Sequence, residues 1–279
     1  MKIALVGNQN SGKTTLFNAI TGMNAKIGNW PGVTVEKKSA IVKGTNYEIT
    51  DLPGIYSLSP YSTEEEIARK FIFEENPEII VNIIDSTSLE RSLYLTTQLL
   101  ELDSKVIVAL NMADMLEKKG IKINIQKLEE KIGTKVVKIS ALKQTGITEL
   151  LSEIKNYRTK NQIKIYDKNL ETAINNINNN ISNNKTNKRF TAVKILESDP
   201  RFCHYCTAFI EEQKHNLRKK YDIDIEEVVA TERYRFIENV KKECTQRIVV
   251  ETHNSDRLDK ILLNKWIAIP IFIGIMFLI

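Results

Sequence analysis

Eight residues near the start of the chain fit the pattern G-x-x-x-x-G-K-S/T: Gly7-Asn8-Gln9-Asn10-Ser11-Gly12-Lys13-Thr14. The residues before them, 2–6, read as a short apolar strand, and the run 15–20, which begins with Thr15, reads as the first turns of a helix. A loop in this position directs its backbone N–H groups at a phosphate, at the positive end of the helix dipole. We therefore expect Lys13 to reach the β- and γ-phosphates of a nucleotide and Thr14 to bind Mg²⁺. A glycine turn without a ligand is the alternative.

Residues 1–157 alternate between strand and helix patterns. Apolar, β-branched runs at 2–6, 79–84, 105–110 and 136–139 are separated by helical patterns at 13–20, 64–75, 89–101, 124–132 and 147–155. This alternation predicts an α/β fold with a mostly parallel sheet and helices on both faces. Residues 35–42 and 46–51 flank Lys43-Gly44-Thr45, which predicts a hairpin and one antiparallel strand, so the sheet should be mixed.

Residues 158–262 differ in composition, being polar, poor in glycine and without strand-like runs. Leu170, Ile174, Ile177 and Ile181 fall at helical spacing. We predict a second, small all-helical domain with helices at about 166–182, 188–197, 203–220, 225–230 and 232–248.

The run Trp266–Ile279 carries no charge and is apolar apart from one proline and one glycine. A bilayer span needs about 20 such residues, so we interpret 263–279 as the start of a first transmembrane helix. A buried or amphipathic C-terminal helix is the alternative. Basic residues lie just upstream, which marks the cytoplasmic side of a first span: Lys241, Lys242, Arg247, Arg257, Lys260 and Lys265.

Composition excludes some classes of protein. The net charge of +5 is mild, and no basic stripe is interleaved with aromatic residues, so we expect no nucleic-acid partner. The three cysteines are an odd number, and residues 1–6 read as a core strand rather than a signal peptide. A reducing, cytoplasmic setting follows for the residues before the apolar run.

Asp51-Leu52-Pro53-Gly54 ends a predicted strand downstream of the phosphate loop. An acid there can hold Mg²⁺ through water, and a glycine N–H can contact the γ-phosphate. Thr34 lies in the polar segment 24–36, where it could bind Mg²⁺ only when a γ-phosphate is present, which would make this segment a switch. Taken singly, D-x-x-G is an ordinary turn and Thr34 is equally a residue that begins a strand.

Asn111-Met112-Ala113-Asp114 follows the predicted strand 105–110. The Asp114 carboxylate can accept from the N1–H and 2-amino groups of guanine, and adenine offers neither donor in that place. A buried carboxylate without a partner loses several kcal/mol, so we expect a large preference for guanine. A helix N-cap is the simpler alternative for Asp114. Backbone groups of Ser140-Ala141-Leu142, after the strand 136–139, would support the base.

The order of these motifs resembles the Ras-like GTPases. The run Asn29-Trp30-Pro31-Gly32-Val33-Thr34-Val35-Glu36, followed by DLPGIYSL, is similar more narrowly to the FeoB family of prokaryotic ferrous iron transport proteins. The resemblance covers essentially the whole chain and adds Gly32, Val33, Val35 and Glu36 to the expected nucleotide-binding segment. It implies that 160–255 is the family's domain that inhibits nucleotide release. It also implies a multi-pass protein of the cell membrane that takes up ferrous iron.

Two positions bear on hydrolysis. Ras-like proteins carry a water-orienting glutamine directly after D-x-x-G, and this chain has Ile55 there. Without that group and without an obvious arginine finger, intrinsic GTP hydrolysis should be slow, about 10⁻⁴ to 10⁻² s⁻¹. In relatives with asparagine at the position of Asn10, its side-chain oxygen binds K⁺, which supplies the charge of an arginine finger. We expect the same here; a loop-bracing hydrogen bond is the alternative.

Cys203-His204-Tyr205-Cys206 is weaker evidence for a site. Thr207 stands where haem attachment needs histidine, and a second pair of zinc ligands is missing. We expect Cys203 and Cys206 to share one face of a helix and pack inward, and assign no role to them or to Cys244.

Two other functions stay open at this point. One is a soluble GTPase of ribosome assembly or tRNA modification, and the other is a GTP-regulated membrane sensor that moves no ion. A homo-oligomer is compatible with the sequence, which does not fix the oligomeric state. For the iron transporter, a GTP switch passed through the helical domain to the membrane part is the hypothesis that the domain order suggests.

Overall fold

The computed structural model describes residues 1–22, 25–59, 61–157, 163–181, 187–248, 269–270 and 276. The described strands are β1 Lys2–Gly7, β2 Lys26–Asn29, β3 Glu36–Ile41, β4 Glu48–Asp51, β5 Ile79–Asp85, β6 Lys105–Asn111, β7 Ile121–Ile123, β8 Val136–Lys138 and β9 Thr245–Arg247. The helices are α1 Lys13–Thr21, α2 Thr63–Glu75, α3 Leu89–Leu100, α4 Ala113–Lys118, α5 Ile125–Ile132, α6 Ile147–Lys155, α7 Lys168–Asn180, α8 Lys188–Leu196, α9 Ala208–Tyr221 and α10 Ile225–Cys244. Two short 3₁₀ turns are η1 Ser86–Ser88 and η2 Pro200–Tyr205.

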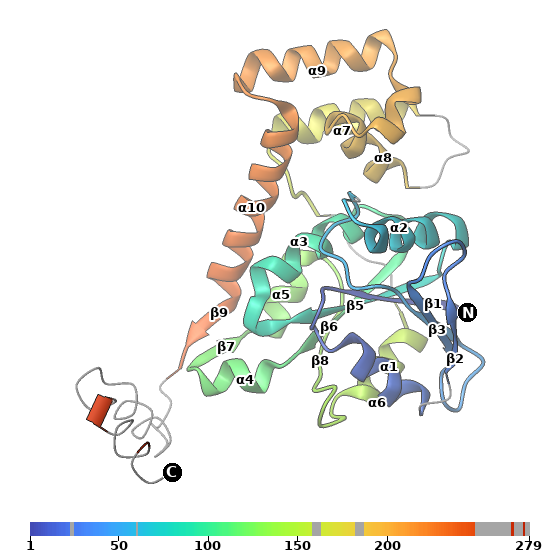
Figure 1. The fold of residues 1–279 in the computed structure, drawn as a ribbon. Coiled ribbons are helices and arrows are strands. Elements are labelled where there is room, and N and C mark those ends of the chain that lie inside the picture. Colours follow the sequence, from blue (N-terminus) through green and yellow to red (C-terminus); the bar gives the residue numbers. More distant parts are fainter. Residues whose placement is uncertain are drawn as a thin grey trace.

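Seven strands form a mixed sheet in the order β2-β3-β4-β1-β5-β6-β8 (Figure 1). β1 runs parallel to β4 and β5, and β6 runs parallel to β5 and β8. β3 is antiparallel to both of its neighbours, which confirms the predicted hairpin and mixed sheet. Because the parallel strands point the same way, their carboxyl ends bring the loops after β1, β4 and β6 to one edge, the usual place for a ligand.

Both faces of the sheet are buried, as the unbroken apolar runs of the strands predict. Alternate residues of β1 enter two separate clusters: Ile3 and Leu5 pack with α1 and α6, and Ala4 and Val6 with α2, α3 and α5. Figure 1 shows these two groups of helices on opposite sides of the sheet.

Helices α7, α8, α9 and α10 make up most of the predicted helical part, and their buried residues join a core cluster of the sheet. Leu170, Phe190 and Val229 belong to the same buried cluster as α3 and α5. Two predictions here were wrong in detail. The expected helices at 225–230 and 232–248 are the single helix α10, since Thr231 does not interrupt the backbone pattern, and the expected helix at 203–220 begins only at Ala208.

The expectation that residues 158–262 lack strands was also wrong. β9 follows α10 and pairs antiparallel with β7, so the end of the helical part returns to the first domain. Thr245–Arg247 carries no apolar run, and only the backbone ladder to a distant segment defines it. Figure 1 shows α10 running beside α3 and α5 toward this pair of strands.

The predicted transmembrane start, 263–279, lies outside the described residues except for 269–270 and 276. Within the described part of the chain, none of the helices combines the length and the apolar character that crossing a bilayer requires.

Candidate functional site

The loop between β1 and α1 forms one wall of a pocket of about 560 Å³. Its shape is set locally: the backbone oxygen of Asn8 accepts from the Ser11 N–H at 3.3 Å and from the Ser11 hydroxyl at 2.8 Å. Asn10 has φ of 63°, a left-handed conformation that asparagine tolerates, and its side chain is exposed. The lining residues are all ones that the sequence predicted: Asn8, Gln9, Asn10, Gly12, Lys13, Thr14, Thr15, Gly54 and Met112.

Glycine is required at two points of this pocket. Gly12 has φ of +90°, and a Cβ there would lie 2.3 Å from the Asn111 amide nitrogen. A Cβ on Gly54 would lie 3.1 Å from the backbone of Gln9, so the D-x-x-G segment packs directly against the phosphate loop. Larger side chains at either position would force the loops apart.

A lysine, a threonine and an aspartate meet inside the pocket. Lys13 Nζ lies 2.5 Å from Asp51 Oδ1, and the Thr14 hydroxyl donates to Asp51 Oδ2 at 3.2 Å. The side chains of Lys13 and Asp51 are only 10% and 6% exposed. A γ-phosphate that contacts Lys13 would therefore compete with a nearly buried carboxylate for the same ammonium group.

Asn111 connects the predicted motifs. Its amide nitrogen donates to the Ser11 carbonyl at 2.9 Å, and its amide oxygen accepts from the Ala141 N–H at 3.0 Å. Asn111 is buried, so both bonds form away from water. One side chain thus ties the loop after β6 to the phosphate loop and to the loop after β8. Sequence reasoning named Asn111 only as part of a motif and missed this brace.

The structure corrects the expected surroundings of Asp114. Its carboxylate is part-exposed rather than buried, and it forms an ion pair with Lys143, Nζ to Oδ2 at 2.5 Å. The hydrogen bond from Lys143 lowers the pKa of Asp114 below its ordinary value. Asp114 lies in the first turn of α4, whose N-cap is Met112, so it is not the N-cap either. The penalty for an unpaired acid is smaller than expected, because Lys143 is already its partner.

The loop after β8 is closed by backbone bonds between Ser140 and Thr145, at 3.0 and 3.1 Å. Ala141 is buried, whereas the Leu142 side chain is 85% exposed, so any support from Leu142 would come from its backbone. Ala113, at the start of α4, is buried in the core beneath the loop after β6.

The segment that holds Thr34 does not join the pocket in this structure. Trp30 is buried against Phe71 of α2, and its backbone N–H donates to the Val35 oxygen at 2.9 Å. The turn between them leaves Gly32 and Thr34 exposed. Val33 and Val35 pack partly against the core, and Glu36 begins β3. The polar segment 24–36 contains a strand that the sequence did not predict: 26–29 form β2, which is exposed and lacks apolar alternation.

Beyond Gly54 the chain enters the core. Leu52 and Ile55 are buried, and the Ile55 N–H donates to the Gly7 oxygen at 3.1 Å, so the Ile55 side chain cannot orient a water. Sequence reasoning missed two residues that hold the next stretch: Glu65 accepts from the backbone of Tyr56 and Ser57, and Gln98 from Leu58. The sequence Ser62-x-x-Glu65 before a helix, a capping-box pattern, was the signal available for the first.

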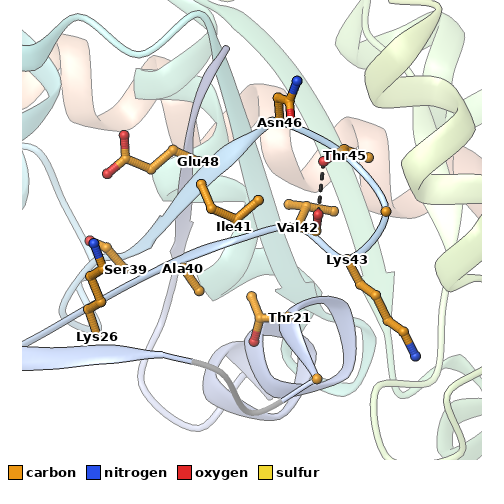
Figure 2. Close-up of a pocket in the computed structure, with 12 residues that line it drawn as sticks. Thr21, Lys26, Ser39, Ala40, Ile41, Val42, Lys43, Thr45, Asn46 and Glu48 are labelled. Atoms are coloured by element: carbon orange, nitrogen blue, oxygen red, sulfur yellow. Dashed lines mark hydrogen bonds between the residues drawn. The ribbon is translucent and has the colours of Figure 1, made fainter.

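A larger cavity, about 720 Å³, lies elsewhere on the first domain (Figure 2). It is lined by the β3–β4 hairpin and the end of α1, including Lys26, Ile41 and Glu48, and contains none of the residues predicted to bind the nucleotide. Size alone therefore does not identify the site; the convergence of Lys13, Asp51 and Asn111 does.

The three cysteines are free thiols. Cys203 and Cys206 are exposed and lie in and after the 3₁₀ turn η2, so the expected inward packing on a helix was wrong. Cys244 is buried at the end of α10. Among the described residues, histidine, cysteine and acidic side chains nowhere gather in threes around a point that could hold a metal ion.

Comparison with known proteins matches both parts of the chain. The family model described as "Ferrous iron transport protein B" covers residues 1–154, and that of the "FeoB cytosolic helical domain" covers 166–246. The Fe(2+) transporter FeoB of Staphylococcus aureus strain MSSA476 is 36% identical over 99% of this chain and 43% of its own length. The Fe(2+) transporter FeoB of Escherichia coli K12 is 33% identical over 100% of this chain and 38% of its own length. The chain thus spans less than half the length of these relatives.

Solved structures agree. A GDP-bound mutant of the S. thermophilus FeoB G-domain has a TM-score of 0.83 and 43% identity, covering 88% of this chain and 100% of its own. S. thermophilus NFeoB bound to GDP.AlF4⁻ and K⁺ has a TM-score of 0.78 and 44% identity, and the match covers 87% of this chain and 99% of its own. The fold is that of a Ras-like G-domain followed by a helical domain. With both family models, full-chain relatives and this geometry in agreement, the chain belongs to the family of ferrous iron transport protein B.

Proposed function

We propose that this chain binds and hydrolyses GTP. The observation that carries the proposal is the pocket in which the phosphate loop, the Lys13–Asp51 pair and the Asn111 brace converge. Asn111 joins the phosphate loop to the two loops that would contact a purine, so phosphates and base would be held by one rigid unit. Relatives of known structure hold GDP, which supports the same ligand here. The nucleotide-contacting residues are those named from the sequence, with Asp114 as the acid that selects guanine.

Asp114→Asn tests the base assignment. We expect affinity for GDP and GTP to fall about 100-fold, because the amide cannot accept from both guanine donors. Affinity for xanthosine diphosphate should rise, because the new N–H can donate to the xanthine 2-oxygen. Titration of fluorescent nucleotides measures both. Glu117→Gln is the matched control, since it makes the same change one turn further along α4, in an exposed pair with Lys138. Loss of GDP binding without any gain for the xanthine nucleotide would contradict the assignment.

Mg²⁺ is the cofactor that the donor set fits. The Thr14 hydroxyl and Asp51 carboxylate are neighbouring hard oxygen donors beside the pocket, and such donors suit Mg²⁺ together with phosphate oxygens. Thr14 would hold the ion directly and Asp51 through water. Thr34 would join them when its exposed turn moves toward the nucleotide. The ion would neutralise phosphate charge in the transition state.

Hydrolysis should be slow and stimulated by K⁺. The buried Ile55 supplies no group that could orient water. The exposed Asn10 amide lines the pocket and is free to turn its oxygen toward a cation near the phosphates. The structure of S. thermophilus NFeoB bound to GDP.AlF4⁻ and K⁺ supports a K⁺-binding role for Asn10. A cation there would add positive charge where the transition state gains negative charge.

GTP hydrolysis in KCl compared with NaCl, at equal ionic strength, tests the potassium role. We expect the rate to be on the order of 10-fold higher in KCl, because K⁺ would offset part of the transition-state charge. Asn10→Ala should remove the difference between the salts. Asn46→Ala, which removes an exposed asparagine of the β3–β4 hairpin, should keep it. Equal rates of the unmodified chain in both salts would count against K⁺ while leaving GTP binding intact.

We further propose that the chain is the cytoplasmic part of a longer ferrous iron transporter. Two full-chain relatives that carry that name, each more than twice as long, support this. In this proposal 1–157 is the G-domain, 158–262 the helical regulatory domain and 263–279 the start of the first transmembrane helix. Fe²⁺ uptake by the longer protein in vesicles, with GTP or a non-hydrolysable analogue inside, tests the transport role.

A further inference from the structure

Residues 55–59, the stretch that follows Gly54, form hydrogen bonds with side chains of both domains. Within the first domain, Gln98 of α3 accepts from the Leu58 N–H at 2.6 Å and contacts the Ser57 hydroxyl. From the helical domain, the ammonium group of Lys194 on α8 donates to the Ser59 hydroxyl at 2.5 Å. Ser59 lies five residues after Gly54, which lines the phosphate pocket.

Lys194 is an unusual residue to make this contact, because its side chain is 0% exposed. Burial lowers the pKa of Lys194, and the negative charge of Glu197 opposes that effect. A buried ammonium group needs hydrogen-bond partners, and that of Lys194 donates to Ser59 and Glu197. If Ser59 moves away, the ammonium group keeps Glu197 as a partner but loses one hydrogen bond inside the core.

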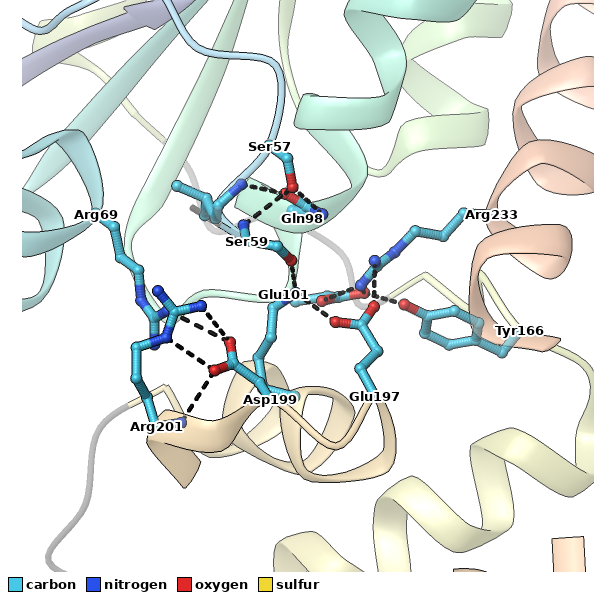
Figure 3. A network of polar contacts seen from close by, with 12 residues as sticks. Ser57, Ser59, Arg69, Gln98, Glu101, Tyr166, Glu197, Asp199, Arg201 and Arg233 are labelled. Carbon is cyan, nitrogen blue, oxygen red and sulfur yellow. Dashed lines mark hydrogen bonds and ion pairs between the residues drawn. The ribbon is translucent and has the colours of Figure 1, made fainter. Parts of the chain in front are cut away.

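The anchor of Lys194 is itself fixed. Glu197 also accepts from Arg233 of α10 at 2.7 Å, and Arg233 contacts both oxygens of Glu101 at 3.0 Å. Burial opposes the charge of Glu197, but Arg233 and Lys194 outweigh it and lower its pKa. Figure 3 shows Ser59 at the edge of this network, with Glu101, Glu197 and Arg233 beyond it.

The other end of the same stretch is Asp51, which holds Lys13 in the phosphate pocket. A γ-phosphate would draw Lys13 toward itself and engage the N–H of Gly54, so the residues after Asp51 would have to shift. A shift of Ser59 would weaken its bond to Lys194, because Glu197 holds the ammonium group from the side of the helical domain. The bond between Ser59 and Lys194 therefore stabilises the conformation seen here over one in which the residues after Gly54 have shifted.

We propose that Lys194 is a positioning residue for the nucleotide site: through Ser59 it holds the stretch after Gly54 and thereby weakens binding of GTP relative to GDP. The inference rests on the proposed GTP binding and names how the helical domain acts on that site. Lys194 touches no nucleotide, so its effect is on the balance between two ligands rather than on either alone.

The test is the ratio of affinities for a non-hydrolysable GTP analogue and GDP, measured by calorimetry on the whole chain. In Ser59→Ala the hydroxyl is lost while the buried charges remain paired, and we expect the ratio to shift about fivefold toward the GTP analogue. Lys194→Met should shift it the same way, and Lys194→Arg, which keeps a donor, should restore it toward the original value. Ser198→Ala is the matched control: it removes a Ser–Lys bond of 3.3 Å, to Lys214, that lies wholly within the helical domain.

If Ser59→Ala changes the affinity for the GTP analogue relative to GDP by less than twofold, or shifts it toward GDP, the positioning role is overturned. Nucleotide binding itself would still stand. If Lys194→Met does not fold, Ser59→Ala decides alone, because Ser59 is a part-exposed residue. Hydrogen exchange adds an independent readout: the GTP analogue should speed exchange in α8 of the unmodified chain and leave it unchanged in Ser59→Ala. Failure of the unmodified chain to bind either guanine nucleotide would instead remove the proposed function, and this inference with it.

Discussion

Lys13→Met should lower the affinity for GDP and GTP by about 100- to 1000-fold, which corresponds to about 3 to 4 kcal/mol. The Lys13 ammonium group is nearly buried and is held at the pocket by Asp51, so its charge acts on phosphates with little screening by water. Methionine keeps most of the length and volume of the side chain and removes the charge. Loss for GTP should exceed loss for GDP, because lysine in such loops reaches both the β- and γ-phosphates.

Titration with fluorescent nucleotides measures this change, and circular dichroism shows whether the variant keeps its fold. Lys2→Met is the matched control. Lys2 is half-exposed and pairs with Glu75 on the surface, so its loss should change nucleotide affinity less than twofold. A folded Lys13→Met chain that binds GDP within tenfold of the original would show that the phosphates do not lie against this lysine.

Arg233→Met should lower the free energy of unfolding by about 3 to 5 kcal/mol. Arg233 and Glu101 are both 0% exposed, and Arg233 also pairs with Glu197. Burial opposes the charge of Arg233, but Glu101 outweighs it and holds the pKa well above its ordinary value. Removing the guanidinium leaves the fully buried Glu101 and the 11% exposed Glu197 with Lys194 as the neighbouring cation, so one negative charge is uncompensated.

Urea unfolding measures the change. Lys241→Met is the control on the same helix, since Lys241 is 48% exposed and pairs with Glu90, which is 51% exposed; its loss should amount to less than about 1 kcal/mol. Adding Glu101→Gln to Arg233→Met removes the uncompensated charge and should recover part of the loss. Equal stability of the two single variants would mean that the network does not hold α10 to the first domain.

The phosphate loop shows how much of the site a sequence can specify. Its glycines, Lys13 and Thr14 lie within eight consecutive residues, and their geometry follows from a strand, a tight turn and a helix start. The D-x-x-G and N-x-x-D motifs were found the same way, because each comes directly after a strand. Where parallel strands end together, motifs far apart in the chain must meet.

The strands and contacts that the sequence did not predict depend on residues far apart in the chain. β2 carries no apolar alternation, and β9 is a strand only because β7 lies beside it. Lys143 is a charged residue like many others until the fold brings it to Asp114. Lys194 falls at a position where a lysine is expected to face water, and tertiary packing overrode that expectation.

By itself, the sequence determined the α/β order of the first domain, the helical second part and the pocket that would bind a nucleotide. These features depend on local spacing and backbone geometry, which neighbouring residues specify. Only the tertiary structure decided that Asn111 ties three loops together, that Arg233 and Glu101 join the two domains, and that Lys194 reaches Ser59. These contacts link residues 30 to 135 positions apart in the chain. Burial then decides their strength, because a charge away from water depends on the few partners that packing supplies.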